Sequence, residues 1–230
     1  MADSQHAPTL VMARRLRDLA TVLDKLSLST ECTNVGNCAL SLMRAIAPWS
    51  LDLQLEQAKT MALIAQLSPY QPHAHTLFIQ AVSLCEEVVA KDGSQSNKNS
   101  TIGTLDRAGI WSGEHPNLGV QWSGQTIEIM TAELPLTIAN DYIRSRVHLD
   151  HRIHLSRLGR LSDAVDAAQL AVSLSRGLDP VKGKEVLACA LDTLGNRLRE
   201  LRKYEASAAA FEETLELSRS FCRNISVRVV

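Results

Sequence analysis

The strongest constraint on this chain is a spacing that recurs along it. In four places an anchor position opens a helical i, i+3, i+4, i+7 stripe, and sixteen residues later a small residue opens a second stripe. The four anchors are Leu16, Ala58, His148 and Leu191. Leu16 to Ala58 is 42 residues, and His148 to Leu191 is 43. A repeat of this length predicts stacked helical hairpins, because one hairpin cannot bury its apolar stripe alone.

The interval from Ala58 to His148, 90 residues, leaves room for one more hairpin. Thr104, Ala108 and Trp111 mark its first helix, and the stretch "QTIEIMTAEL" marks its second. The sequence therefore predicts five hairpins with a period near 42.

Two polar stretches around this middle hairpin are loop-like by composition, Lys91–Ser100 ("KDGSQSNKNS") and 112–124 ("SGEHPNLGVQWSG"). They predict a division into N-terminal hairpins (1–91), a flexible loop with a degenerate hairpin (92–135), C-terminal hairpins (136–222) and a tail (223–230). Pro135 is expected to end or kink a helix.

Composition favours an all-α fold. Hydrophobic residues make up 45% of the chain but aromatic residues only 4%, and Ala and Leu are abundant. Ala and Leu are strong helix formers, whereas β-sandwiches depend on aromatic and β-branched side chains. Small side chains must therefore fill the core, which suits closely approaching helices.

The last copy carries a resemblance to a known family. It runs Leu191-x2-Leu194-Gly195-x2-Leu198 and then Ser207-x3-Phe211. This resembles the tetratricopeptide repeat (TPR), W-x2-L-G-x2-Y followed by A-x3-F, with Leu in place of both aromatics of the first helix. The long period is similar to that of kinesin-light-chain-like arrays and of arrays in fungal and bacterial signalling proteins.

The resemblance implies a right-handed superhelical stack of antiparallel hairpins, a TPR-like solenoid, whose first helices line a concave groove. It also implies that partners bind in this groove. The first-helix residues that alternate with the packing positions of the last two copies are the expected partner-binding residues. They are Arg146, Asp150, Arg157, Asp192, Asn196 and Arg199.

One known use of the family is disfavoured. Some TPR domains grip the C-terminal carboxylate of chaperones with a Lys four residues before a groove Asn. Here Asp192 stands four residues before Asn196, so this copy lacks that clamp.

Charge and composition exclude other classes of function. The net charge is −1, and the basic group at Arg14, Arg15 and Arg17 fits a solvated helix face, so no nucleic-acid partner is expected. Five scattered cysteines without a C-x-x-C pair indicate reduced thiols. No leader or bilayer-spanning run is present, so the expected location is cytoplasmic, without a membrane partner.

His148, His151 and His154 are the cluster that most suggests chemistry. Zinc needs convergent ligands and usually a fourth from elsewhere, and no Cys lies nearby in sequence. Partly buried histidines on a polar helix are the favoured interpretation, and a metal site or a pH-sensitive contact the alternatives. No catalytic or cofactor-binding motif is present, so we expect no enzyme activity and no cofactor.

The expected function is a non-enzymatic protein–protein interaction scaffold that binds a peptide or protein in its groove. The first alternative is a self-associating or structural fragment of a larger signalling protein, linked to an ATPase or caspase-like module and able to stack through its array ends. The second alternative is an all-α metal protein or enzyme centred on His148–His154.

Overall fold

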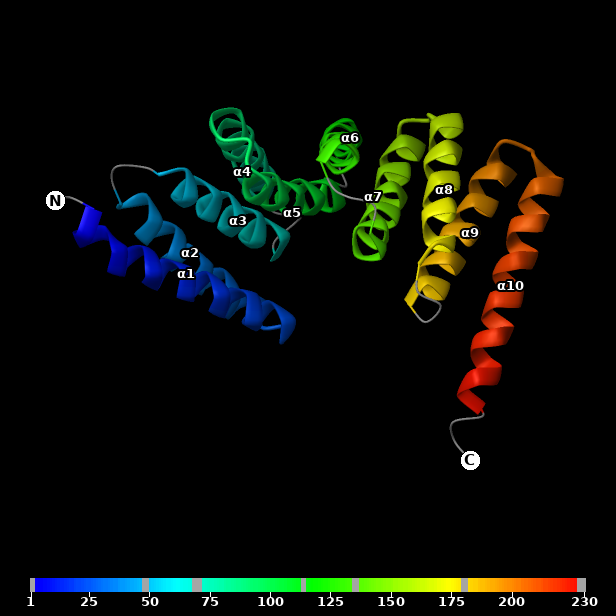
Figure 1. Cartoon of the computed structure of the whole chain (residues 1–230), viewed down its shortest axis with the longest axis horizontal. Helices are drawn as coiled ribbons and strands as arrows, with labels where there is room; N and C mark the ends of the chain where they lie inside the picture. Colours follow the sequence, from blue (N-terminus) through cyan, green and yellow to red (C-terminus); the bar gives the residue numbers. More distant parts are fainter. Residues whose placement is uncertain are drawn as a thin grey trace. The chain divides into compact units, whose positions relative to one another are not determined.

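The chain was analysed as a computed structural model, which describes residues 3–46, 50–67, 72–112, 115–133, 137–178 and 182–226. These residues form ten α-helices and no strand, which confirms the all-α prediction (Figure 1). The chain divides into two compact units, 1–112 and 113–230, each with its own packing. The four-part division expected from the sequence stays a prediction.

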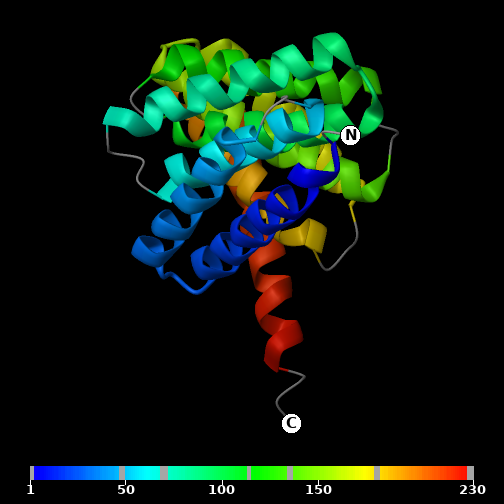
Figure 2. The ribbon, with the colours of Figure 1, turned by 90° about the vertical axis from the view of Figure 1, so that its left-hand side faces the viewer.

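Unit 1 holds five helices. They are α1 (Asp3–Lys25), α2 (Ser29–Arg44), α3 (Leu51–Leu67), α4 (Pro72–Lys91) and α5 (Gln95–Trp111). Helices α1 and α2 form one hairpin and α3 and α4 the next, and the first helices α1, α3 and α5 also contact one another in sequence. Figure 2 shows the α1–α2 pair running side by side.

Unit 2 also holds five helices. They are α6 (Pro116–Glu133), α7 (Ile138–Arg157), α8 (Leu161–Arg176), α9 (Lys182–Glu200) and α10 (Tyr204–Ser226). Helices α7 and α8 pair, as do α9 and α10, and each second helix packs against the first helix that follows, as α8 does against α9. The apolar core here includes Val165 and Val172 of α8 against Leu191 and Leu194 of α9.

Three of the hairpins turn by the same local device. Ser27, Gly159 and Arg202 each adopt a left-handed conformation, with φ of 59°, 73° and 59°. In each turn the next residue donates its backbone N–H to the carbonyl five residues earlier, as in a Schellman motif. The bonds are Leu28 N to Leu23 O (3.0 Å), Arg160 N to Leu155 O (2.9 Å) and Lys203 N to Leu198 O (2.9 Å). The repeat predicted from sequence spacing is thus present in the backbone.

The two helices of a hairpin meet at small residues. Cys32 Sγ donates to Ala20 O at 2.9 Å, and Ser207 Oγ donates to Gly195 O at 2.7 Å. In both cases the acceptor lies twelve residues earlier, on the first helix, and the donor is the small residue identified from the spacing. This bond needs the helix backbones to come close, which explains why small residues occupy these positions.

The two predicted loops are shorter than expected, because residues 95–100 and 116–124 are helical. Helix α5 begins at Gln95, because the Asn97 side chain is held by Asp92, with Nδ2 donating to the Asp92 carbonyl (3.0 Å) and carboxylate (2.9 Å). Helix α6 begins at Pro116, a position where proline fits because the first N–H groups of a helix have no intrahelical partner. The segment expected to form the middle hairpin therefore holds two full helices, α5 in unit 1 and α6 in unit 2, of which the sequence indicated only parts.

The expected tail is partly helical, because α10 continues to Ser226, and residues 227–230 lie outside the described residues. Pro135 also lies outside them, although α6 does end two residues before it, at Glu133.

Substitution of Gly195 tests how closely α9 and α10 approach each other. A Cβ on Gly195 would lie 2.8 Å from Phe211 Cε1, whereas a Cβ on Gly103, also within a helix, would meet nothing within 4 Å. We expect Gly103→Ala to stabilise the chain by about 1 kcal/mol through helix propensity. We expect Gly195→Ala to destabilise it by about 1 kcal/mol, because overpacking costs more than propensity gains. Urea denaturation of both variants measures the difference, and equal stabilisation would refute the close contact.

Candidate functional site on the first helices

The three predicted residues of α9 form one hydrogen-bonded row. Asn196 Nδ2 donates to the Asp192 carbonyl at 2.9 Å and to its carboxylate at 3.3 Å. Arg199 Nη2 donates to Asn196 Oδ1 at 3.1 Å. Their spacings of four and three residues keep all three on one face of the helix. Asp192 and Arg199 are exposed and Asn196 is half-buried, so the row offers ordered polar groups to solvent.

The three predicted residues of α7 also share one face. Arg146, Asp150 and Arg157 fall within about 40° of each other at 100° per residue. Arg146 and Arg157 are exposed and Asp150 is half-buried. Helix α7 packs against α9, so the two polar faces belong to neighbouring first helices.

Arg152, which the sequence analysis did not identify, lies near the contact between α7 and α9. Arg152 donates through Nε to the Leu149 carbonyl at 3.2 Å. Burial, and then the charge of Arg197 on α9, lower the pKa of the Arg152 guanidinium. Arg197 in turn pairs with Glu200 at 2.8 Å. Cys189, Asp150 and Glu200 oppose the shift, so charges of both signs lie where α7 packs against α9.

Unit 1 has a polar cavity on its first helices. Its volume is about 640 Å³, and its lining includes Arg17 of α1, Lys59 of α3, and Asn99 and Arg107 of α5. Sequence reasoning assigned Arg17 to a solvated face and did not identify the other three. The repeat spacing alone could have linked Arg17 and Lys59, which each follow an anchor directly and are 42 residues apart, but it does not extend to Asn99 or Arg107.

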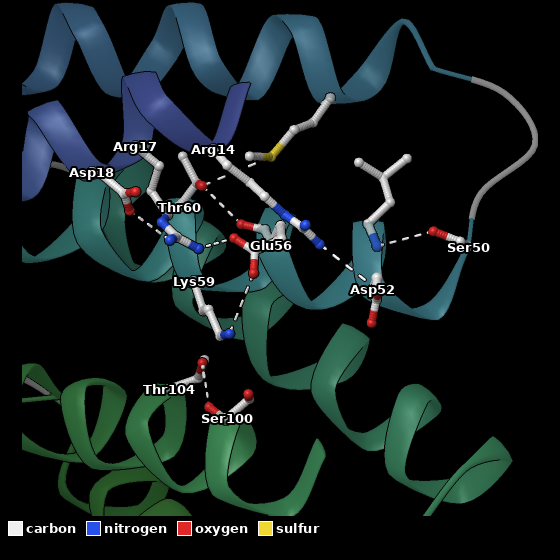
Figure 3. Close-up of polar contacts among 12 residues, drawn as sticks. Arg14, Arg17, Asp18, Ser50, Asp52, Glu56, Lys59, Thr60, Ser100 and Thr104 are labelled. Atoms are coloured by element: carbon white, nitrogen blue, oxygen red, sulfur yellow. Dashed lines mark hydrogen bonds and ion pairs between the residues drawn. The ribbon is translucent and has the colours of Figure 1, made fainter. Parts of the chain in front are cut away.

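A buried carboxylate organises this cavity. Glu56 is buried on α3, pairs with Arg17 of α1, and lies 3.4 Å from Lys59 Nζ (Figure 3). Arg17 also holds Asp18 at 2.6 Å. Burial, and then the charges of Arg17 and Arg14, lower the pKa of Lys59, although Cys85 and Asp52 oppose the shift. The environment of Lys59 therefore disfavours its positive charge.

The three histidines lie on α7 but do not form a metal site. His148 and His154 are buried and His151 is half-buried. No group of three His, Cys, Asp or Glu side chains within the described ranges is arranged to hold a metal ion. His151 Nδ1 instead lies 2.7 Å from Ser123 Oγ of α6, and Ser123 also donates to the Gly119 carbonyl. Because Ser123 is buried at 2% exposure, we interpret this contact as a tie between α6 and α7.

Comparison with known proteins identifies the fold. The structure matches BtubC from P. vanneervenii with a TM-score of 0.64 and 11% identity, over 96% of this chain and 92% of that one. It also matches kinesin light chain TPR-like repeats from Podosopora anserina with a TM-score of 0.61 and 14% identity, over 91% of this chain and 96% of that one.

The fold is TPR-like.

A third match is PlcR from Bacillus thuringiensis, solved in complex with the peptide PapR7 and DNA. Its TM-score is 0.54 at 11% identity, over 94% of this chain and 73% of that one. No family model and no curated protein matches the sequence. At these identities the likeness concerns the fold, which confirms the TPR-like solenoid class predicted from the repeat. Among the described helices none is long and apolar enough to cross a membrane.

Acid is expected to destabilise unit 2 through His148. Burial, and then the charges of His151 and Arg144, lower the pKa of His148 to about 4. The folded chain therefore keeps this imidazole neutral, while the unfolded chain protonates it below about pH 6.5. The free energy of unfolding should fall as pH drops through that range, by about 2 kcal/mol between pH 7 and pH 5 from this residue. Urea denaturation at both pH values should show a smaller fall for His148→Gln than for the wild type. An equal fall in both would show that His148 does not titrate in this way.

Proposed function

We propose that this TPR-like chain is a non-enzymatic scaffold that binds a peptide or protein partner on the first helices α7 and α9. The proposal rests on the row Asp192–Asn196–Arg199, whose side chains are linked by hydrogen bonds. Asp192 fixes the Asn196 amide, and the Asn196 oxygen orients the Arg199 guanidinium. An ordered row loses less side-chain entropy on binding than the same residues would if they were unconstrained.

The chemistry of this row suits a peptide. An extended peptide presents backbone donors and acceptors along one edge, and a face that carries carboxylate, amide and guanidinium groups can match both. The exposed Arg146 and Arg157 of α7 extend the same chemistry to the neighbouring helix. PlcR, a structural neighbour, was solved with both a peptide and DNA. The net charge of −1 here favours the peptide as the kind of partner. A cytoplasmic location is part of the proposal.

Loss of the row should weaken the capture of partners. We expect Asn196→Ala/Arg199→Ala to reduce retention of specific partners from native lysate at least tenfold, because two directional contacts disappear together. The matched control is Gln169→Ala/Arg176→Ala, two exposed residues of the second helix α8. Arg176 pairs with Glu213, but exposed pairs contribute little to stability. Quantitative mass spectrometry of the captured proteins compares the variants. Equal capture by both double variants would refute the α9 row as the binding site.

A second candidate function is self-association through the array ends. Met12 and Leu19 of α1, and Leu26 directly after its end, are exposed at 57%, 46% and 63%. By the offset of 175 residues that aligns the Leu16 and Leu191 anchors, they correspond to Leu187 and Leu194 of α9 and to Leu201 directly after it. Leu194 belongs to the core shared with α8, and Leu187 and Leu201 are partly buried against that core. The apolar face that α9 turns to its neighbour is therefore exposed on α1.

Helix α10 has the complementary surface. Ala208 and Leu215 are exposed, and they correspond to Val165 and Val172 of α8, which are buried in the same core. A second copy could thus place its α1 on α10 in the way that α9 packs on α8.

This candidate predicts a concentration-dependent mass. Sedimentation velocity of the intact chain should show species larger than a monomer that increase with concentration. Leu19→Glu/Leu26→Glu should return the chain to a monomer, because two buried carboxylates would oppose the contact. Ile79→Glu, at an exposed apolar position of α4, serves as the control and should not change the mass. A monomeric wild type at all concentrations would exclude self-association.

A further inference from the structure

The cavity of unit 1 receives one cation from each of three helices. Arg17 comes from α1, Lys59 from α3 and Arg107 from α5, and all three line the same space of about 640 Å³. Ligand sites commonly fall between about 300 and 1,000 Å³. Gly103 lies in the wall, and a Cβ there would meet nothing within 4 Å, so the wall is open at this point.

The acids of this region leave positive charge unbalanced. Arg17 forms ion pairs with Glu56 and Asp18, and Arg14 lies 3.8 Å from Asp52. Lys59 shares Glu56 with Arg17 and has one long contact to it, at 3.4 Å. Arg107 has no ion-pair partner within the described part of the chain. Arg17, Lys59 and Arg107 of the cavity are thus matched by two carboxylates, Glu56 and Asp18, which leaves one cation in excess.

The neutral residues of the wall add donors. Gln95 Nε2 donates to Asn99 Oδ1 at 3.0 Å, which orients the Asn99 amide so that its amino group remains to donate. Lys59 extends from α3 toward α5, where Ser100 and Thr104 lie (Figure 3). The guanidinium of Arg107 offers five N–H donors and no acceptor. The cavity therefore suits a ligand with several acceptor oxygens.

We propose that this cavity binds a phosphomonoester group, held by Arg107, Lys59 and the Asn99 amide. A phosphomonoester carries nearly two negative charges and three strong acceptor oxygens, so it matches two cationic donors and an amide donor better than a singly charged carboxylate does. The group could belong to a small phosphorylated metabolite or to a phosphorylated side chain of a partner, and both offer the same chemistry. The residues are distinct from the α9 row on which the proposed function rests.

Calorimetric titration of the intact chain tests the site with inorganic phosphate, O-phosphoserine, a phosphoserine peptide and a matched glutamate peptide. We expect saturable binding of phosphate and O-phosphoserine that weakens as salt rises. We expect Arg107→Met and Lys59→Met each to weaken it at least tenfold, because each removes a charged donor. Arg17 is left intact because it pairs with the buried Glu56. Circular dichroism verifies that the variants fold.

Two controls separate this site from others. Arg44→Met, at an exposed arginine of α2, should bind phosphate as the wild type does, and so should Asn196→Ala/Arg199→Ala. If the phosphoserine peptide binds at least tenfold tighter than O-phosphoserine, the source is a partner's side chain, and if the two are equal it is a free metabolite. The proposal is overturned if phosphate and O-phosphoserine do not bind. It is equally overturned if the glutamate peptide binds as tightly as the phosphopeptide, or if Arg107→Met leaves binding unchanged.

Discussion

The close approach of the two helices within a hairpin is the constraint on which this structure depends. Cys32 and Ser207 each reach across to a backbone carbonyl of the preceding helix, so a bulky side chain at either acceptor position would push the helices apart. Thin hairpins of this kind have apolar faces on both sides. Each hairpin must therefore bury a face against the next, and the low aromatic content of the chain, 4%, follows from the small space between the helices.

The charged side chains of the first helices lie in different environments in the two units. In unit 2 the residues of the α9 row are bonded to one another at the surface, so their charges are largely solvated. In unit 1 a carboxylate, Glu56, is buried among cations. Removing charges from water is costly unless they are paired, so Glu56 draws Arg17 and Lys59 from two helices to one place. One repeat architecture thus presents an open polar strip in one unit and a charged cavity in the other.

The sequence predicted the parts of this fold that depend on spacing. The recurrence of small residues sixteen positions after each anchor revealed the hairpins, because packing imposes that distance on every copy. The sequence analysis missed the start of α5, where the Asn97 side chain donates hydrogen bonds to Asp92 and a polar stretch is helical. It also missed the cavity of unit 1, because Arg17, Lys59 and Arg107 are brought together only by the stacking of three helices. The α9 row could be predicted from the sequence because its three residues lie within about two turns of one helix.

The repeated turns have a consequence for how the chain folds. Each of the three left-handed turns is closed by a backbone hydrogen bond between residues only five apart in sequence. The Cys32 and Ser207 bonds between the two helices of a hairpin join residues twelve apart. Such contacts are local, so their formation carries little loop-closure entropy. A hairpin such as α9–α10 can therefore begin to form without waiting for residues at the other end of the chain. Folding can start at several hairpins and spread to their neighbours, and the loss of one hairpin need not prevent the others from forming.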